Sequence, residues 1–150
     1  MNTKLVSSID AVARSRLVTI SADALLIDAA RALSDTQISL IVVCDSDEAM
    51  VGVITKTNIV QQIGHCGERA CATTATDVMT RDVVYCRPTD CLPDVLSMMQ
   101  NRGFVHVPIV DENCKPSGVV NARDALRALM AEEKYEASLL RDYVMGVGYR

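Results

Sequence analysis

The segment Gly52-Val53-Ile54-Thr55-Lys56-Thr57-Asn58 has a counterpart 66 residues later, Gly118-Val119-Val120-Asn121-Ala122-Arg123-Asp124. Each segment places a glycine and two β-branched apolar residues ahead of a polar stretch, which is typical of a strand that runs into a helix. The same offset aligns further pairs without a gap: Val18 with Val84, Asp28 with Asp94, Asp45 with Asp111, Ile41 with Val107, and Val43 with Ile109. Two copies of one supersecondary unit explain this pattern.

The first copy has the pattern of a β-α-β-β-α unit. We expect strands at residues 17–20, 38–43 and 51–54, a polar turn at 45–48, a helix capped near 21–23, and a closing helix that includes 59–63. The apolar stripe of the first helix consists of Leu26, Ala29, Ala30 and Leu33.

The second copy repeats this order. Its expected elements are strands at 83–86, 104–110 and 118–120, a helix around 93–101, and a helix that opens near Asp124. Pro93 fits only in the first turn of its helix, so that helix is predicted to begin between residues 89 and 92. The predicted fold class is α+β (α/β): two β-α-β-β-α repeats with pseudo-two-fold symmetry plus a C-terminal helix.

The predicted organisation has four parts. Repeat 1 spans residues 5–64, a linker spans 65–76, repeat 2 spans 77–130, and a C-terminal amphipathic helix spans 131–150. The last helix has spare apolar surface, so we expect it to dock on the body of the protein or on a second subunit.

Composition excludes several classes of protein. Of the 150 residues, 49% are hydrophobic and 23% are charged, which is typical of a globular chain. A net charge of −4, no Trp and a single Phe argue against a nucleic-acid-binding protein. The apolar runs are too short to span a membrane, and residues 1–10 lack the apolar centre of a secretory signal. We therefore expect a cytoplasmic protein.

The six cysteines form no Cys-x-x-Cys pair. In a reducing compartment we interpret them mostly as small buried hydrophobic residues. His65, Cys66 and Cys71 are the one cluster that combines imidazole with thiols, but they lack a fourth ligand and match no structural zinc spacing. We therefore expect no metal site, and a thiol or metal switch at Cys66 and Cys71 stays as an alternative.

Catalytic motifs are missing from the sequence. Neither His65 nor His106 lies in a nucleophile motif or a zinc-protease motif, and no dinucleotide-binding or Walker glycine loop is present. Asp45 and Asp47 lie in a predicted turn without the apolar pocket that a catalytic carboxylic acid needs. The sequence therefore predicts no enzymatic activity.

Residues 5–129 resemble a tandem pair of cystathionine-β-synthase (CBS) domains, also called a Bateman module. The likeness rests on Asp77-Val78-Met79-Thr80, on Phe104-Val105-His106-Val107-Pro108-Ile109-Val110-Asp111, and on the two closing segments quoted above. The resemblance implies a regulatory protein that binds an adenine nucleotide, such as AMP, ADP, ATP or NAD(H). It also implies a flat homodimer in which four repeats form a disk.

The closing segment of repeat 2 suggests a nucleoside site on physical grounds. A strand that ends at Val120 and turns into a helix presents backbone N–H groups that suit a phosphate, and the Asp124 carboxylate can accept both hydroxyls of a ribose. The resemblance implies the same role for Asp124, with the middle strand of the other repeat completing the cleft. We therefore expect Asn121, Arg123 and Asp124 to face Ser39 and Leu40, and Thr55, Lys56, Thr57 and Asn58 to face Val105 and His106.

Both predicted clefts depart from the family pattern. Asn58 stands at the ribose-binding Asp position of the first, and Asn121 replaces the usual Ser or Thr of the second. Ser39 and Val105 stand where a basic residue often helps to hold phosphate. Basic residues that could compensate are Lys56, Arg87, Arg102 and Arg123. We favour the Asp124 cleft as the nucleoside site.

Alternatives remain open at two residues and for the function. Asp124 could simply cap its helix, and His106 could be either a buried hydrogen-bonded residue or a group that faces phosphate. The first functional hypothesis is a nucleotide-binding homodimer that senses energy or redox state. The second is an interaction scaffold with degenerate clefts, whose C-terminal helix docks a client protein.

Overall fold

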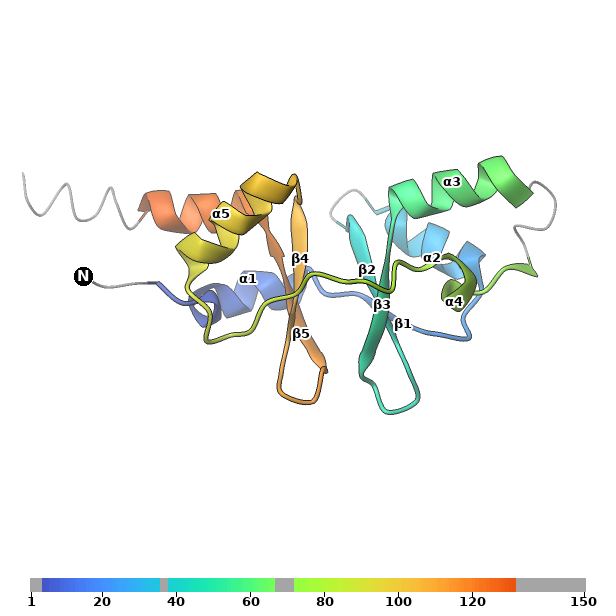
Figure 1. Cartoon of the computed structure of the whole chain (residues 1–150), viewed down its shortest axis with the longest axis horizontal. Coiled ribbons are helices and arrows are strands. Elements are labelled where there is room, and N and C mark those ends of the chain that lie inside the picture. Colours follow the sequence, from blue (N-terminus) through green and yellow to red (C-terminus); the bar gives the residue numbers. More distant parts are fainter. Residues whose placement is uncertain (1–3, 36–37, 67–71, 132–150) are drawn as a thin grey trace, which may run out of the picture.

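Two small β-sheets face each other at the centre of the molecule, with helices on their outer sides (Figure 1). The structure, a computed structural model, describes residues 4–35, 38–66 and 72–131. Within these ranges, no helix is both long enough and apolar enough to cross a membrane.

The first sheet has the order β1-β2-β3. Strand β1 (Thr19–Ser21) is parallel to β2 (Leu40–Cys44), which is antiparallel to β3 (Met50–Thr55). Helices α2 (Leu26–Leu33) and α3 (Lys56–Cys66) pack on its outer side.

Side chains of β2 alternate between two cores, as a period of two requires. Ile41 and Val43 pack beneath the helices of the first half. Leu40 and Val42 point the other way and meet Val119 of the second sheet. This shared layer explains why the run is apolar without interruption.

The second half repeats the arrangement. It consists of α5 (Leu92–Arg102), β4 (His106–Val110), β5 (Pro116–Asn121) and a helix over residues 122–131. Leu40 pairs with Thr55 in the first half and His106 with Asn121 in the second, again 66 residues apart. The predicted fold class and the start of α5 are confirmed, with Pro93 in the first turn of that helix.

The strand predicted at 83–86 shrinks to a single parallel bridge between Cys86 and Ile109. Two prolines account for the loss. In the first half the N–H of Val42 donates to Val18 and that of Ala22 donates to Cys44, at 2.9 Å each. The residues 66 positions later are Pro108 and Pro88, which have no N–H to donate.

The helix cap predicted at residues 21–23 is wrong. Helix α2 begins at Leu26, and its N-cap Leu25 makes no side-chain hydrogen bond. The N–H of Leu26 donates instead to the carbonyl of Thr73 at 2.8 Å, so the segment between the repeats satisfies this helix end. The Ser21 hydroxyl accepts the N–H of Asp23, in a local turn.

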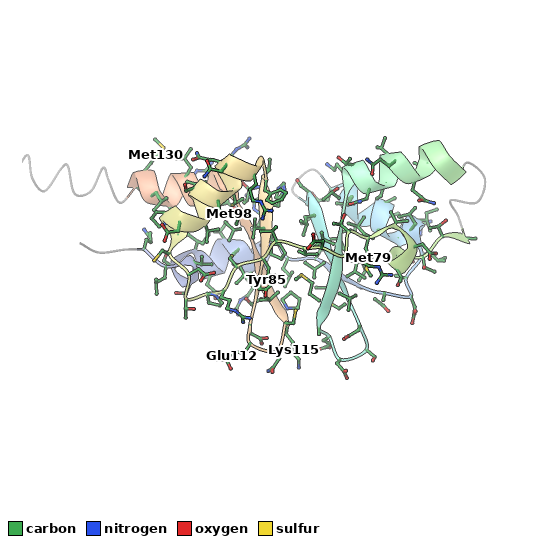
Figure 2. The ribbon with its side chains drawn as sticks, in the orientation of Figure 1. Met79, Tyr85, Met98, Glu112, Lys115 and Met130 are labelled. Carbon is green, nitrogen blue, oxygen red and sulfur yellow. The ribbon has the colours of Figure 1, made fainter. Side chains whose placement is uncertain are left out.

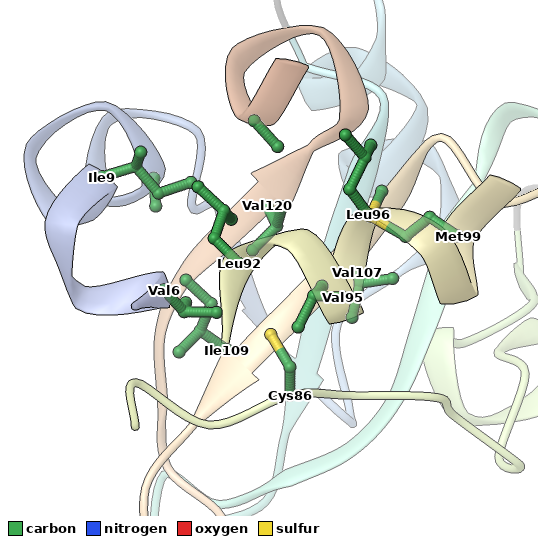
Figure 3. Close-up of a cluster of buried hydrophobic side chains, with 12 residues drawn as sticks. Val6, Ile9, Cys86, Leu92, Val95, Leu96, Met99, Val107, Ile109 and Val120 are labelled. Atoms are coloured by element: carbon green, nitrogen blue, oxygen red, sulfur yellow. The ribbon is translucent and has the colours of Figure 1, made fainter. Parts of the chain in front are cut away.

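The short helices ahead of each repeat are exchanged between the two halves. Val6 of η1 (Val6–Ile9) and Ala13 of α1 (Asp10–Ser15) belong to the core of the second half, where Val6 lies near Leu92 and Ile109 (Figure 3). Helix α4 (Ala75–Val78), with Met79 just after it, packs in the core of the first half (Figure 2). Each half is therefore completed by chain that precedes the other half.

Several predicted features fall wholly or partly outside the described residues. They are the helix at 131–150 beyond residue 131, Cys71, and the side chains of His65 and Cys66. Among the residues that are described, no group of three or more His, Cys, Asp or Glu side chains could hold a metal ion. Cys44 and Cys86 are buried free thiols.

Candidate functional site

A cleft of about 640 Å³ opens between the first turn of α3 and strand β4. We call it the Asn58 cleft. It brings together eight of the predicted site residues: Ser39, Leu40, Thr55, Lys56, Thr57, Asn58, Val105 and His106. The predicted facing of 55–58 and 105–106 therefore occurs in one cleft. Ser39 and Leu40, expected opposite Asp124, also line this cleft.

Strand β3 ends at Thr55 and α3 begins at Lys56, so the positive end of the helix opens directly into the cleft. The same turn carries Lys56 and Thr57, both exposed. A helix N-terminus with a lysine at its first position favours a phosphate or another anion.

The Asn58 side chain holds this turn. Its Oδ1 accepts the N–H of Thr55 at 2.9 Å and the Thr55 hydroxyl at 3.0 Å. Its Nδ2 donates to the Thr80 hydroxyl at 3.2 Å. The amide thus closes the end of α3 in the manner of a capping box and ties it to the segment after α4.

Asp82 lies in the wall of the same cleft and was missed by the sequence reasoning. Among the described residues, Asp82 is the one carboxylate that lines the cleft and Lys56 is the one ammonium. Asp82 is exposed and makes no hydrogen bond or ion pair with another described residue. The rest of the wall is largely apolar, with Leu40, Val83 and Pro108 among its residues.

His106, the first residue of β4, lines the Asn58 cleft from the second repeat. Its Nε2 lies 3.2 Å from Nδ2 of Asn121. The pKa of His106 is lowered by burial and then by the positive charges of Arg16 and Lys56, against the opposing effect of Asp124. A neutral imidazole that accepts from the Asn121 amide at Nε2 fits these surroundings, so the hydrogen-bonded interpretation of His106 describes its contacts.

Asp124 is engaged by Arg16. Arg16 Nε lies 2.9 Å from Oδ2 of Asp124, and Nη2 lies 3.0 Å from Oδ1. The side chain of Asp124 is only 4% exposed, and the hydrogen bond to it raises the pKa of Arg16. A ribose could reach this carboxylate only after Arg16 had moved, so the ribose role of Asp124 stays a prediction.

Two other residues of the favoured Asp124 site lie apart from Ser39 and Leu40. Val120 is fully buried in the core of the second half, because it points toward the helices rather than the cleft. Arg123 is exposed and lines a shallow groove with Leu126 and Met130. The direction of each side chain depends on register and helix phase, which the motif alone does not specify.

The repeat offset relates the two sites. Arg16 and Asp82 stand 66 residues apart, as do Asn58 and Asp124. The second site therefore holds an Arg16–Asp124 pair where the first holds Asp82 and Asn58. Applying the offset to the residues just before each predicted first strand would have found both Arg16 and Asp82.

Two segments of the chain match one family profile. The family profile of the CBS domain matches residues 6–65 and 75–131. The chain belongs to the CBS domain family. A 17.7 kDa protein from Acidianus ambivalens is 27% identical to this CBS pair over 144 residues, which cover 96% of this chain and 86% of the relative. A homoserine O-acetyltransferase from Methanosalsum zhilinae is 28% identical over 106 residues, covering 71% of this chain but only 20% of the enzyme.

Solved structures of other CBS pairs share the fold. The CBS domain pair of protein MJ0100, in complex with 5′-methylthioadenosine and S-adenosyl-L-methionine, gives a TM-score of 0.73 at 22% identity over 87% of this chain and 99% of that one. The structure of CBSX2 in complex with AMP gives a TM-score of 0.73 at 19% identity. The match covers 87% of this chain and 98% of that one.

Proposed function

We propose that this CBS pair is a regulatory module that binds an adenosine-containing ligand in the Asn58 cleft. The observation that carries the proposal is the cleft itself. Its volume of about 640 Å³ suits a ligand of nucleotide size, and it joins a mostly apolar wall to the N-terminus of α3. The adenine would lie against apolar residues such as Val83, Val84 and Pro108, and a phosphate would lie near Lys56.

The ligands of two structural relatives support the same class. One relative is in complex with AMP, the other with 5′-methylthioadenosine and S-adenosyl-L-methionine. All three molecules contain adenine joined to a ribose ring with 2′ and 3′ hydroxyls. AMP is therefore the first ligand to test, and ADP, ATP and NAD(H) are the remaining candidates of the nucleotide class.

Regulation would follow from the position of the cleft between the two halves. Its walls come from β3 and α3 of one half and from β4 of the other. A ligand that touches both halves favours the relative position in which both contacts are made. The exchanged helices α1 and α4 would carry such a change to the opposite core.

The same proposal includes a homodimer through the outer helices. Exposed apolar side chains gather on α3, where Val60 is 68% and Ile63 is 58% exposed, and on the helix over 122–131, where Leu126 is 46% exposed. Both helices lie on the same side of the molecule, and Met130 lies at the end of the second (Figure 2). Leu126 stands 66 residues after Val60, so a two-fold axis would bring equivalent surfaces together.

Isothermal titration with AMP tests the ligand-binding part. We expect one AMP per chain, and the variant Lys56→Ala should weaken binding several-fold because it removes the ammonium beside the helix end. Lys115→Ala is the matched control, since Lys115 is an exposed lysine on the distant β4–β5 hairpin (Figure 2). Ser39→Trp should fill the cleft and abolish binding. The same heat of binding in the wild-type chain and in all three variants would contradict the proposal.

A second candidate function is the interaction scaffold. The observation that favours it is the engagement of both candidate ribose ligands, Asn58 by the α3 cap and Asp124 by Arg16. The scaffold predicts that AMP, ADP, ATP and NAD(H) all fail to bind at millimolar concentration. Truncation after Leu129 would then abolish dimerisation or capture of a client while leaving the fold of the two repeats intact.

A further inference from the structure

The charges around the Asn58 cleft nearly cancel. Lys56 supplies one positive charge and Asp82 one negative charge, and these are the charged side chains that line it among the described residues. His106, the third titratable group, has its pKa lowered by burial and by nearby cations, so it stays neutral near pH 7. Besides Lys56, the N-terminus of α3 adds positive potential equivalent to about half a charge. Arg16 also acts on His106, but its charge is paired with Asp124.

The chain two residues before Asp82 is anchored to β3. The N–H of Thr80 donates to Val53 at 2.8 Å, and the N–H of Val53 donates to Thr80 at 3.0 Å. The Thr80 hydroxyl also accepts from Asn58. Asp82 follows this anchored residue by two positions and is one of the residues that line the cleft. It is exposed, and its carboxylate makes no hydrogen bond or ion pair with another described residue.

A ribose brings two neighbouring hydroxyl donors into any adenosine site. Asn58 cannot accept them, because its Oδ1 already takes two hydrogen bonds from Thr55. An ionised carboxylate has two oxygens and can accept both hydroxyls. Among the described residues of the cleft, Asp82 is the group with this capacity.

We propose that Asp82 binds the ribose hydroxyls and limits the Asn58 cleft to adenosine ligands that carry at most one phosphate. This inference rests on the proposed function and narrows its ligand class. A monophosphate ester carries about −1.5 to −2 charges near pH 7, and each further phosphate adds to them. With Asp82 offsetting Lys56, the end of α3 leaves about half a positive charge, which balances one such group only in part. A triphosphate would place uncompensated negative charge in a cleft that already holds a carboxylate.

The test compares adenosine, AMP and ATP by isothermal titration in magnesium-free buffer at low salt. For the wild-type chain we expect AMP to bind at least tenfold more tightly than ATP. Asp82→Asn should weaken the binding of adenosine about tenfold, which is the effect of losing a hydrogen bond to a charged group. The same variant should tighten the binding of ATP. Glu112→Gln, which removes an exposed carboxylate from the β4–β5 hairpin, should change neither.

Opposite shifts for adenosine and ATP distinguish ribose recognition from a merely structural effect, which would move both affinities in one direction. Equal or tighter binding of ATP by the wild-type chain would overturn the inference and leave the proposed function standing. Shifts of the same sign in Asp82→Asn, or no shift, would also overturn it. Absence of binding by all three ligands would instead refute the proposed function together with this inference.

Discussion

Replacing Arg16 by methionine should destabilise the protein by about 2–4 kcal/mol. The variant leaves the Asp124 carboxylate, which is 4% exposed, without the guanidinium that now lies within 3.0 Å of both its oxygens. Removing one partner of a buried ion pair costs about 3–5 kcal/mol. We lower that range because the Arg16 side chain is 23% exposed, so water can reach Asp124 once Arg16 is truncated.

Urea unfolding at pH 7 measures this loss, and the melting temperature should fall by about 10 °C in parallel. The control is Arg14→Met, which removes an arginine two residues earlier whose side chain is 70% exposed and pairs with Asp10. Such an exposed pair within one helix contributes about 0.3–0.5 kcal/mol. The double variant Arg16→Met, Asp124→Asn should recover much of the loss, because it leaves no unpaired charge. A loss below about 1 kcal/mol for Arg16→Met, or a double variant as unstable as the single one, would refute the ion-pair reasoning.

Three further predictions concern stability and thiol reactivity. Because the pKa of His106 is lowered in the folded protein, the unfolded chain takes up this proton first as the pH falls below about 6.5, and the free energy of unfolding should drop over that range. His106→Gln should flatten this pH dependence, measured by urea unfolding. Equal pH dependence in the two proteins would refute the prediction. Gly52→Ala should lower the free energy of unfolding by about 1–3 kcal/mol, since the added Cβ would lie 2.5 Å from the Met79 sulfur and 2.9 Å from the Thr80 carbonyl oxygen. Its control is Gly64→Ala in α3, which has open space around it and should be neutral or stabilising in thermal melts. Burial, aided by the charge of Asp90, raises the pKa of Cys86 to about 12. In the native protein, Cys86 should therefore resist alkylation at pH 8, whereas in urea it should be labelled readily. Rapid labelling of the native protein, measured by peptide mass spectrometry, would contradict the burial.

The repeat could be predicted because each copy repeats its apolar positions at a constant offset. Strand pairs such as Leu40 with Thr55 and His106 with Asn121 follow directly from that offset. What the pattern did not reveal was the exchange of the leading helices. Ala13 lies against Gly118, a contact between residues more than a hundred positions apart, and no local periodicity specifies such a contact.

The candidate site was predictable in part: residues 55–58 face 105–106 as expected, whereas the partner of Asp124 was not predictable. The closing motif identified Thr55, Lys56, Thr57 and Asn58, and the structure brings them together with Val105 and His106. The preference for Asp124 rests on the chemistry of its carboxylate and on the family pattern, and neither shows that Arg16 lies beside it. Partners distant in sequence decide whether a carboxylate is free to bind a ligand.

The most direct test of the ligand site is a crystal structure of the protein grown with AMP. Our account predicts electron density for the nucleotide in the Asn58 cleft, with the phosphate near the first turn of α3, the ribose hydroxyls at Asp82, and Arg16 still paired with Asp124. Nucleotide density beside Asp124 with Arg16 displaced, and an Asn58 cleft without nucleotide, would contradict it.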